Sequence, residues 1–382
     1  MPEPIRETVS DATWLDAMLE VERALVNAEA LAGIVPADVA AAIAEACVPD
    51  HYEIDALSEE ARASGNPAEP LVRALRAQVG GDAARWVHFG ATSQDVLDSA
   101  AMLVARSALE LIQEEAGGVA AACARLADAH RDTPMAGRTL LQQAVPTTFG
   151  LTAAGWLDAV VDARANLAAL VLPAQLGGAA GTLAPFGDRG LDVLRLFAQE
   201  LELAEPTLPW HTQRAPVRRL AGALAGTAAA CAKIGLDVVL LAQTELGEVS
   251  EGSGGGSSTM PHKRNPVRAV LARACARGVR AQVAVLAAGE HELERAAGAW
   301  HAEWAALSDA LALTGGATAA IRECLDGLAV HPERMRANMT PDLFAERDAL
   351  VKRGVLAASD GDYLGSAAAF VDRAVARYRN AS

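Results

Sequence analysis

The segment with the clearest capacity for chemistry occupies residues 256–266 and reads Gly-Ser-Ser-Thr-Met-Pro-His-Lys-Arg-Asn-Pro. It follows a glycine-rich stretch that interrupts any helix and could deliver a reactive serine, Ser257, to a substrate. Lys263 adds a fixed charge that suits a carboxylate intermediate, and a helix predicted to start at Pro266 would complete an anion site with its N–H groups. The alternative is a surface linker that ends in an Asn265 cap, but flexible linkers rarely combine these residues.

A second segment, residues 88–95 (His-Phe-Gly-Ala-Thr-Ser-Gln-Asp), places hydroxyl groups just before an apolar run. The spacing Thr92-x-x-Asp95 is that of a capping box, which satisfies the first N–H groups of a helix. A capped helix start also presents hydroxyl and N–H groups to an anion. Thr92 and Ser93 are therefore candidate ligands of a carboxylate, with His88 as a candidate anion ligand beside them.

Three further segments carry weaker signals. Residues 137–150 predict only a loop followed by a helix entry that contains a proline. Residues 210–214 (Trp-His-Thr-Gln-Arg) include Arg214, which could contact a carboxylate. The glycine-rich residues 175–182 lack the strand–turn–helix context of a nucleotide site, so we attribute these glycines to close packing of helices.

Helical periodicity dominates the elements that must position these segments, and we find no convincing alternating strand. The first predicted helix is expected to bury one face that includes Leu31. Helices are predicted over residues 12–33, 95–130, 148–171 and 216–248, and from Pro266 onward. The fold is therefore predicted to be all-α, an elongated bundle of long helices with small helical N- and C-terminal domains. The predicted domain ranges are 1–105, 106–325 (the bundle) and 326–382 (a reduced C-terminal cap).

Composition narrows the partners that this chain can have. Its 382 residues carry a formal net charge of −15, which argues against nucleic acid because phosphate binding needs a basic face. A small anionic polycarboxylate held by a local cationic cluster is the partner that fits. The five cysteines lack disulfide or zinc spacing and predict free thiols in a reducing cytoplasm. We expect no signal peptide, membrane span, metal or organic cofactor, since none of the corresponding sequence patterns is present.

Residues 256–266, between two long predicted helices, closely resemble the signature loop of the fumarase/aspartase superfamily. The resemblance extends from Trp14 to about Asn338. It implies that Ser257 is the group that takes or returns the proton on carbon. It also implies a homotetramer whose sites combine segments of several subunits. The candidate substrate-binding residues are His88, Thr92, Ser93, Arg138, Thr139, Gln142, Arg214, Met260, His262, Lys263 and Asn265.

Within this superfamily the chain is most similar to the 3-carboxy-cis,cis-muconate cycloisomerase branch. The similarity rests on the amino-acid sequences of segments 91–95, 142–150, 154–158 and 362–372. It implies the conversion of 3-carboxy-cis,cis-muconate to 4-carboxymuconolactone. Adenylosuccinate lyase, which has a similar signature loop, and a non-catalytic relative stay open as alternatives.

The chain departs from the superfamily pattern in the loop after Gly137, where Leu140 and Gln143 stand at positions that usually carry a histidine. That histidine would protonate a poor leaving group, such as an amine or hydroxide. In lactone opening the leaving group is the substrate's own carboxylate, with a pKa of about 4, which needs no proton at neutral pH. We therefore predict that no histidine acts as a leaving-group acid in this protein.

Overall fold

The computed structural model describes residues 3–252, 255–256, 260, 263–289, 291–357 and 361–381. The chain forms two compact units. The first contains Met1–Leu111, Ala169–Gly222 and Arg280–Ala312, and the second contains Ile112–Ala168, Ala223–Val279 and Leu313–Ser382. Most of the described residues are helical, so the predicted all-α fold is confirmed. The predicted domain ranges follow other boundaries and stay a prediction.

Four long helices contribute residues to both units. They are α6 (Ser93–Ala129), α9 (Ala215–Leu241), α10 (Val267–Leu286) and α11 (Ala299–Asp326). Alanine is frequent in all four, and it enters a helix without loss of side-chain entropy. With 37 residues, α6 is about 55 Å long at 1.5 Å per residue. Helices predicted from Asp95, Pro216 and Pro266 therefore begin within about two residues of their expected positions.

The first unit is built around α2 (Asp11–Leu31), which packs against α3 (Ala37–Ala46) and α8 (Gly190–Glu200). The Ser10 hydroxyl caps α2 by accepting the N–H of Thr13 at 3.2 Å. Leu31 is 64% exposed, so the prediction that it lies on the buried face was wrong; it occupies the last turn, where the helix leaves the core. The remaining elements are α1 (Glu3–Glu7), η1 (Pro49–His51), α4 (Ile54–Ser64), α5 (Ala68–Val79), η2 (Gly81–Trp86), η3 (Gly178–Ala180) and η4 (Ala184–Arg189).

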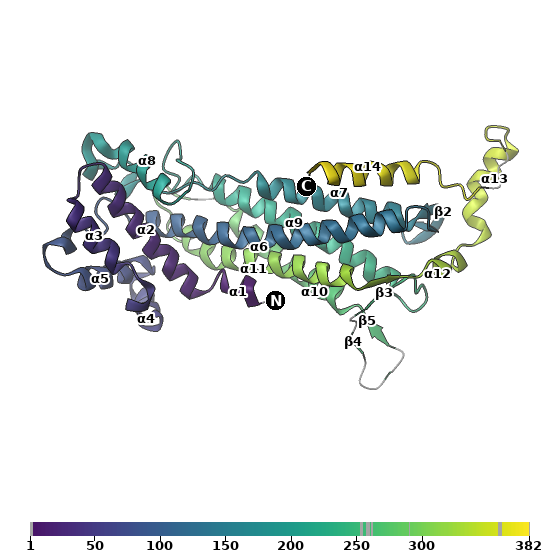
Figure 1. Cartoon of the computed structure of the whole chain (residues 1–382), viewed down its shortest axis with the longest axis horizontal. Helices are drawn as coiled ribbons and strands as arrows, with labels where there is room; N and C mark the ends of the chain where they lie inside the picture. The colour runs from purple at the N-terminus through teal and green to yellow at the C-terminus, as the bar shows by residue number, and fades with distance from the viewer. Residues whose placement is uncertain are drawn as a thin grey trace. The chain divides into compact units, whose positions relative to one another are not determined.

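The second unit contains α7 (Phe149–Ala168) and α14 (Ala367–Ala381), which lie side by side (Figure 1). Its core includes Phe149, Trp156 and Val371 from these two helices. The unit also contains short antiparallel strand pairs: β1 (Pro134–Thr139) with β2 (Gln142–Thr148), β3 (Val249–Glu251) with β6 (Leu328–Val330), and β4 (Gly255–Gly256) with β5 (Arg264–Asn265). The elements between β6 and α14 are α12 (Pro332–Ala337), η5 (Pro341–Phe344) and α13 (Ala345–Lys352).

These strands were not predicted from the sequence. The loop predicted over residues 137–150 is a hairpin whose two-residue turn is Leu140-Leu141, with φ values of 51° and 64°. Such a turn normally carries Asn-Gly, because positive φ is costly for residues with a large side chain. Two leucines therefore gave no hairpin signal. Helix α9 also ends at Leu241, seven residues before the predicted end at residue 248.

Helix α9 is long and apolar enough, by length and composition, to cross a membrane, and no other helix among the described residues meets that test. Half of the relevant stretch is buried inside the structure. Core helices of globular proteins meet the same test, so α9 is weak evidence for a membrane span.

The cysteines behave as the sequence predicts: all five are free thiols. Cys275 is partly exposed and the other four are buried. Burial, followed by the nearby charge of Glu22, raises the pKa of Cys47 to about 12, and burial also raises the pKa of Cys275. These thiols are protonated at neutral pH and are therefore poor nucleophiles.

Glu29 on α2 is a buried acid with an unusual proton affinity. Its side chain is fully buried, and neither carboxylate oxygen has a hydrogen-bond partner among the described residues. Burial, with a contribution from the charge of Glu22, raises the pKa of Glu29 to about 9. The folded protein therefore keeps a proton that the unfolded chain releases near pH 4.5. The free energy of unfolding therefore decreases as the pH rises from about 4.5 to about 9, because the unfolded chain loses this proton and the folded protein does not.

Glu29→Gln is expected to stabilise the protein at pH 7.5 by about 2–4 kcal/mol, because each pH unit above 4.5 costs the wild type up to about 1.4 kcal/mol. At pH 5 the variant and the wild type should differ little. Unfolding in urea at the two pH values measures both differences. Glu45→Gln, on the exposed face of α3, is the matched control and should give no pH-dependent difference. An equal effect of Glu29→Gln at both pH values would contradict the prediction.

Candidate active site

The start of α6 in the first unit has one of the two contacts of the predicted capping box: the Asp95 carboxylate accepts the Thr92 N–H, but the Asp95 N–H donates to the Thr92 carbonyl rather than to its hydroxyl. The N–H of Thr92 donates to Asp95 Oδ2 at 3.0 Å, and the N–H of Asp95 donates to the Thr92 carbonyl at 2.9 Å. Asp95 is buried, whereas Thr92 and Ser93 are partly exposed. The two hydroxyl-bearing residues therefore lie at a fixed helix start, as a carboxylate-binding role requires. Their contact with substrate stays a prediction.

His88 precedes this helix start in a left-handed backbone conformation, with φ of 60°. Its Nδ1 lies 2.6 Å from Oε1 of Glu22, which is 1% exposed. Burial acts to lower the pKa of His88, but the charge of Glu22 and its hydrogen bond together raise the pKa above its ordinary value. One nitrogen of His88 is thus taken by a protein carboxylate, which limits what the ring can offer a substrate.

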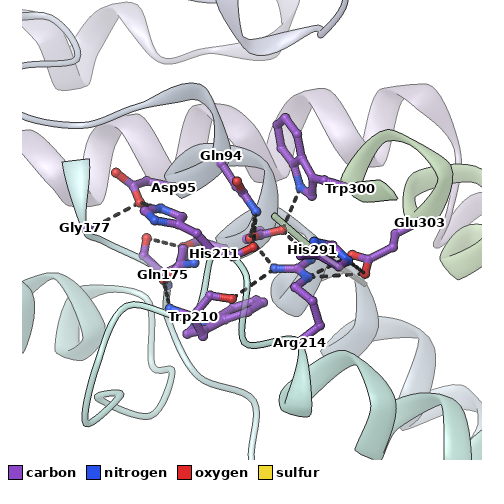
Figure 2. A network of polar contacts seen from close by, with 12 residues as sticks. Gln94, Asp95, Gln175, Gly177, Trp210, His211, Arg214, His291, Trp300 and Glu303 are labelled. Carbon is purple, nitrogen blue, oxygen red and sulfur yellow. Dashed lines mark hydrogen bonds and ion pairs between the residues drawn. The ribbon is translucent and has the colours of Figure 1, made fainter. Parts of the chain in front are cut away.

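Arg214 is held by carboxylates of the protein itself. Its guanidinium is 2% exposed and donates to Asp98 at 2.6 and 2.9 Å and to Glu303 at 2.5 and 3.0 Å (Figure 2). Burial opposes the charge, but the two carboxylates hold the pKa of Arg214 above its usual value. Two buried protein carboxylates therefore occupy this side chain, which disfavours the predicted contact with a substrate carboxylate.

The same buried cluster contains three further side chains, those of Trp300, His291 and Trp210. Trp300 Nε1 donates to Asp98 Oδ1 at 3.0 Å, and His291 Nε2 lies 3.1 Å from Glu303 Oε1. The guanidinium carbon of Arg214 stands 4.8 Å from the centre of the Trp210 ring. The His291 side chain is 2% exposed, and its Nδ1 has no hydrogen-bond partner among the described residues. Within the first unit the cluster joins α6 and α11 to the segment that immediately precedes α9.

Arg138, on β1 of the second unit, is also engaged by a protein carboxylate. Both of its terminal nitrogens donate to Glu248, at 2.9 and 2.6 Å, and Glu248 is fully buried. Asn338 Nδ2 donates to the same carboxylate at 2.8 Å. The structure therefore favours a role for Arg138 in holding β1 over the predicted role as a direct substrate ligand.

Thr139 and Gln142 pair across the end of the β1–β2 hairpin, and both are exposed. Between them, Leu140 is 96% exposed and Leu141 is 71% exposed. Gln143, at the second position where the superfamily carries a histidine, donates instead to the Asn338 carbonyl at 2.9 Å. The hairpin end thus offers the two predicted polar ligands and two apolar side chains, with no histidine.

Lys263 and Asn265 line one pocket of the second unit. The pocket has a volume of about 710 Å³ and lies between the end of α9 and the start of α10. The described part of the signature segment also includes Met260, which is 41% exposed. Ser257 and His262 lie outside the described residues. Among the predicted ligands of the second unit, the structure therefore brings Lys263 and Asn265 together.

The start of α10 binds a carboxylate of the protein itself, so the predicted anion site there is not open to a substrate. The N–H groups of Arg268 and Ala269 each donate to the Glu251 carboxylate at 3.0 Å. Glu251 is 6% exposed and caps this helix start from β3. The first N–H groups of α10 are therefore satisfied internally, and Asn265, which lies on β5, is not the cap that the linker alternative expects.

Comparison with known proteins decides the family. A family profile described as "Lyase" matches residues 3–281, which is more than half of the sequence. The chain belongs to the lyase family. A solved relative of this lyase, the 3-carboxy-cis,cis-muconate lactonizing enzyme from Pseudomonas putida, superposes with a TM-score of 0.91 at 37% identity. The match covers 99% of this chain and 97% of the relative, which confirms the predicted superfamily and fold.

Two curated relatives of this lyase differ in the substrates that their names give. Nitrosuccinate lyase from Streptomyces davaonensis is 50% identical, and the match covers 88% of this chain and 74% of the relative. The 3-carboxy-cis,cis-muconate cycloisomerase from Bradyrhizobium diazoefficiens is 46% identical, with 88% of this chain and 76% of the relative covered. The two relatives are thus named for different reactions.

Three carboxylates of the lyase hold distant segments in place, and the sequence did not predict this role for any of them. They are Asp95, for which only helix capping was predicted, Glu248 and Glu251. Each is buried and accepts hydrogen bonds from residues distant in sequence, apart from the Thr92 cap. Their importance has no local signature, because a buried acid and an exposed acid look the same in a helical or loop sequence. The glycine-rich residues 175–182 were also misjudged, because Gly177 and Gly178 donate to Asp95 rather than pack between helices.

Proposed function

We propose that this lyase converts 3-carboxy-cis,cis-muconate to 4-carboxymuconolactone, a step of protocatechuate breakdown in the β-ketoadipate pathway. The observation that carries the proposal is the likeness, over nearly its whole length, to the solved lactonizing enzyme of Pseudomonas putida. Three curated relatives named 3-carboxy-cis,cis-muconate cycloisomerase, at 44–46% identity, support it.

In the lactonising direction a carboxylate oxygen of the substrate attacks an alkene carbon, and a C–O bond forms. The electron pair of the double bond moves toward a neighbouring carboxylate, whose charge Lys263 and Asn265 would stabilise. Ser257 then gives a proton to carbon, which completes the lactone. The attacking carboxylate is already ionised at neutral pH and needs no base. Leu140 and Gln143 in place of the superfamily histidine are compatible with this course.

Elimination of nitrite from nitrosuccinate is the second candidate, favoured by the 50% identity to the curated nitrosuccinate lyase. Ser257 would remove the proton on carbon, the C–N bond would break, and nitrite would leave with its electron pair. Nitrite is a weakly basic anion and departs without protonation. The absence of histidine at Leu140 and Gln143 therefore fits this reaction as well as lactonisation, and it fits poorly with the release of an amine.

A direct comparison of kcat/KM separates these reactions. Purified protein is assayed separately with three substrates: 3-carboxymuconate, nitrosuccinate and adenylosuccinate. Turnover of the muconate is measured by the loss of its diene absorbance, and turnover of nitrosuccinate by the release of nitrite. We expect the muconate to be preferred by at least about tenfold, within the discrimination that a shaped pocket supplies. Ser257→Ala, prepared in parallel, excludes a contaminating enzyme. Faster release of nitrite than consumption of muconate would replace the first proposal with the second.

We also propose a cytoplasmic homotetramer that needs no metal or organic cofactor. Exposed apolar side chains on α9 and α10 (Leu236, Val270 and Leu271) support association, because isolated bundles rarely leave such faces in water. Among the described residues, no group of three or more potential ligands is arranged for a metal ion. Light scattering at assay concentration should give four times the monomer mass, and full activity in a monomer would contradict the proposal.

A further inference from the structure

The carboxylate of Asp95 joins segments of the chain that are far apart in sequence. Oδ1 accepts the N–H of Gly177 at 3.0 Å and faces His211 Nε2 at 2.7 Å. Oδ2 accepts the N–H of Thr92 at 3.0 Å and the N–H of Gly178 at 2.9 Å. Because an ionised carboxylate only accepts, His211 donates from Nε2. Asp95 is 1% exposed, so these four donors replace the water that a buried carboxylate would lose. Figure 2 shows two of them, Gly177 and His211, beside the carboxylate.

The glycines at this contact are required by geometry. Gly178 has φ of 67°, and a Cβ there would lie 2.7 Å from the Gly90 carbonyl oxygen. A Cβ on Gly177 would lie 2.8 Å from His211 Cε1. The two successive N–H groups therefore form a concave anion-binding turn, and the protein fills it with its own carboxylate.

Arg295 holds the outer side of the same turn. Its Nη2 donates to the carbonyls of Gly178 and Ala179, at 3.3 and 3.0 Å. Its Nη1 donates to Gln94 Oε1 at 3.2 Å, next to Asp95 in the chain. The glycine turn is thus fixed to the start of α6 from two directions, by a buried anion and by a partly exposed cation.

We propose that Asp95 is a positioning residue: it locks the Thr92–Ser93 helix start against the Gly177–Gly178 turn so that the two hydroxyls face a substrate carboxylate in one orientation. The role of Thr92 and Ser93 in binding rests on the proposed function. Asparagine cannot replace Asp95, since its NH2 group would meet two N–H donors. The loss would leave those donors buried without an acceptor.

The test separates positioning from a general loss of stability. Asp95→Asn should raise amide hydrogen exchange at least tenfold in residues 88–94 and 175–180. It should also raise KM by about tenfold while kcat changes less. Thr92→Val removes the hydroxyl through which Asp95 is proposed to act. In the double variant the two effects on KM should therefore not add. Additive effects, or unchanged exchange in the two segments, would overturn the proposal.

Glu303→Gln is the control, because Glu303 is also buried but contacts Arg214 and His291 rather than the start of α6 or the glycine turn. It should lower stability, yet its effect on KM should add to that of Thr92→Val. If Asp95→Asn does not fold, Arg295→Met loosens the same turn from its outer side and should give a smaller, non-additive rise in KM. If the wild type turns over neither 3-carboxymuconate nor nitrosuccinate, the proposed function is wrong. Hydrogen exchange in Asp95→Asn then still tests whether Asp95 positions the two segments.

Discussion

Replacing Ser257 with alanine is expected to lower kcat by roughly 10²–10⁴, the range for loss of a general acid–base group. Ser257 is the first serine of the signature pair and, by resemblance, the group that handles the proton on carbon. Ser257 lies outside the described residues, and the described strands on either side of it, Gly255–Gly256 and Arg264–Asn265, pair with each other. Arg264 and Asn265 also line the pocket that contains Lys263.

The second serine, Ser258, supplies the matched control. Ser258→Ala should keep kcat within a few-fold of the wild type, since only one hydroxyl can occupy the position in line with carbon. A reaction run in deuterium oxide adds a readout of the proton step: wild type should place one deuterium on the carbon that Ser257 protonates. A Ser257→Ala variant with near wild-type kcat would remove this residue from the mechanism.

The largest loss of stability is expected for Arg214→Met, at about 3–5 kcal/mol, the cost of leaving buried charges without their partner. The substitution keeps an unbranched side chain of similar length and leaves Asp98 and Glu303 facing each other without a cation. Both carboxylates are nearly inaccessible to water. Urea unfolding at pH 7 measures the loss.

Two comparisons show whether the loss comes from unpaired charge. Arg377→Met removes an arginine that pairs with Asp158 and Asp162 on the exposed surface, and it should change stability little. Adding Asp98→Asn and Glu303→Gln to Arg214→Met should restore part of the stability, because the neutral cluster no longer buries anions. If Arg214→Met unfolds at the same urea concentration as wild type, the cluster does not hold the first unit together.

Sequence alone was sufficient for the starts of several long helices of this protein, although it did not predict α11. The long helices α6, α9 and α10 follow from alanine content and from apolar residues at helical spacing, which are local properties. Their starts were readable because Thr92, Pro216 and Pro266 are start signals that act within one turn. The signature segment likewise identified the superfamily, since its order of residues is unusual for a linker.

The tertiary structure alone decided which charged residues are available to a substrate. Arg214 meets Glu303 across 89 positions of sequence, and Arg138 meets Glu248 across 110. No local pattern marks an arginine as paired, because its partner is set by the packing of helices and strands. The β1–β2 hairpin was hidden for a related reason: its turn, Leu140-Leu141, holds a backbone conformation that leucine seldom adopts unless the surrounding structure imposes it.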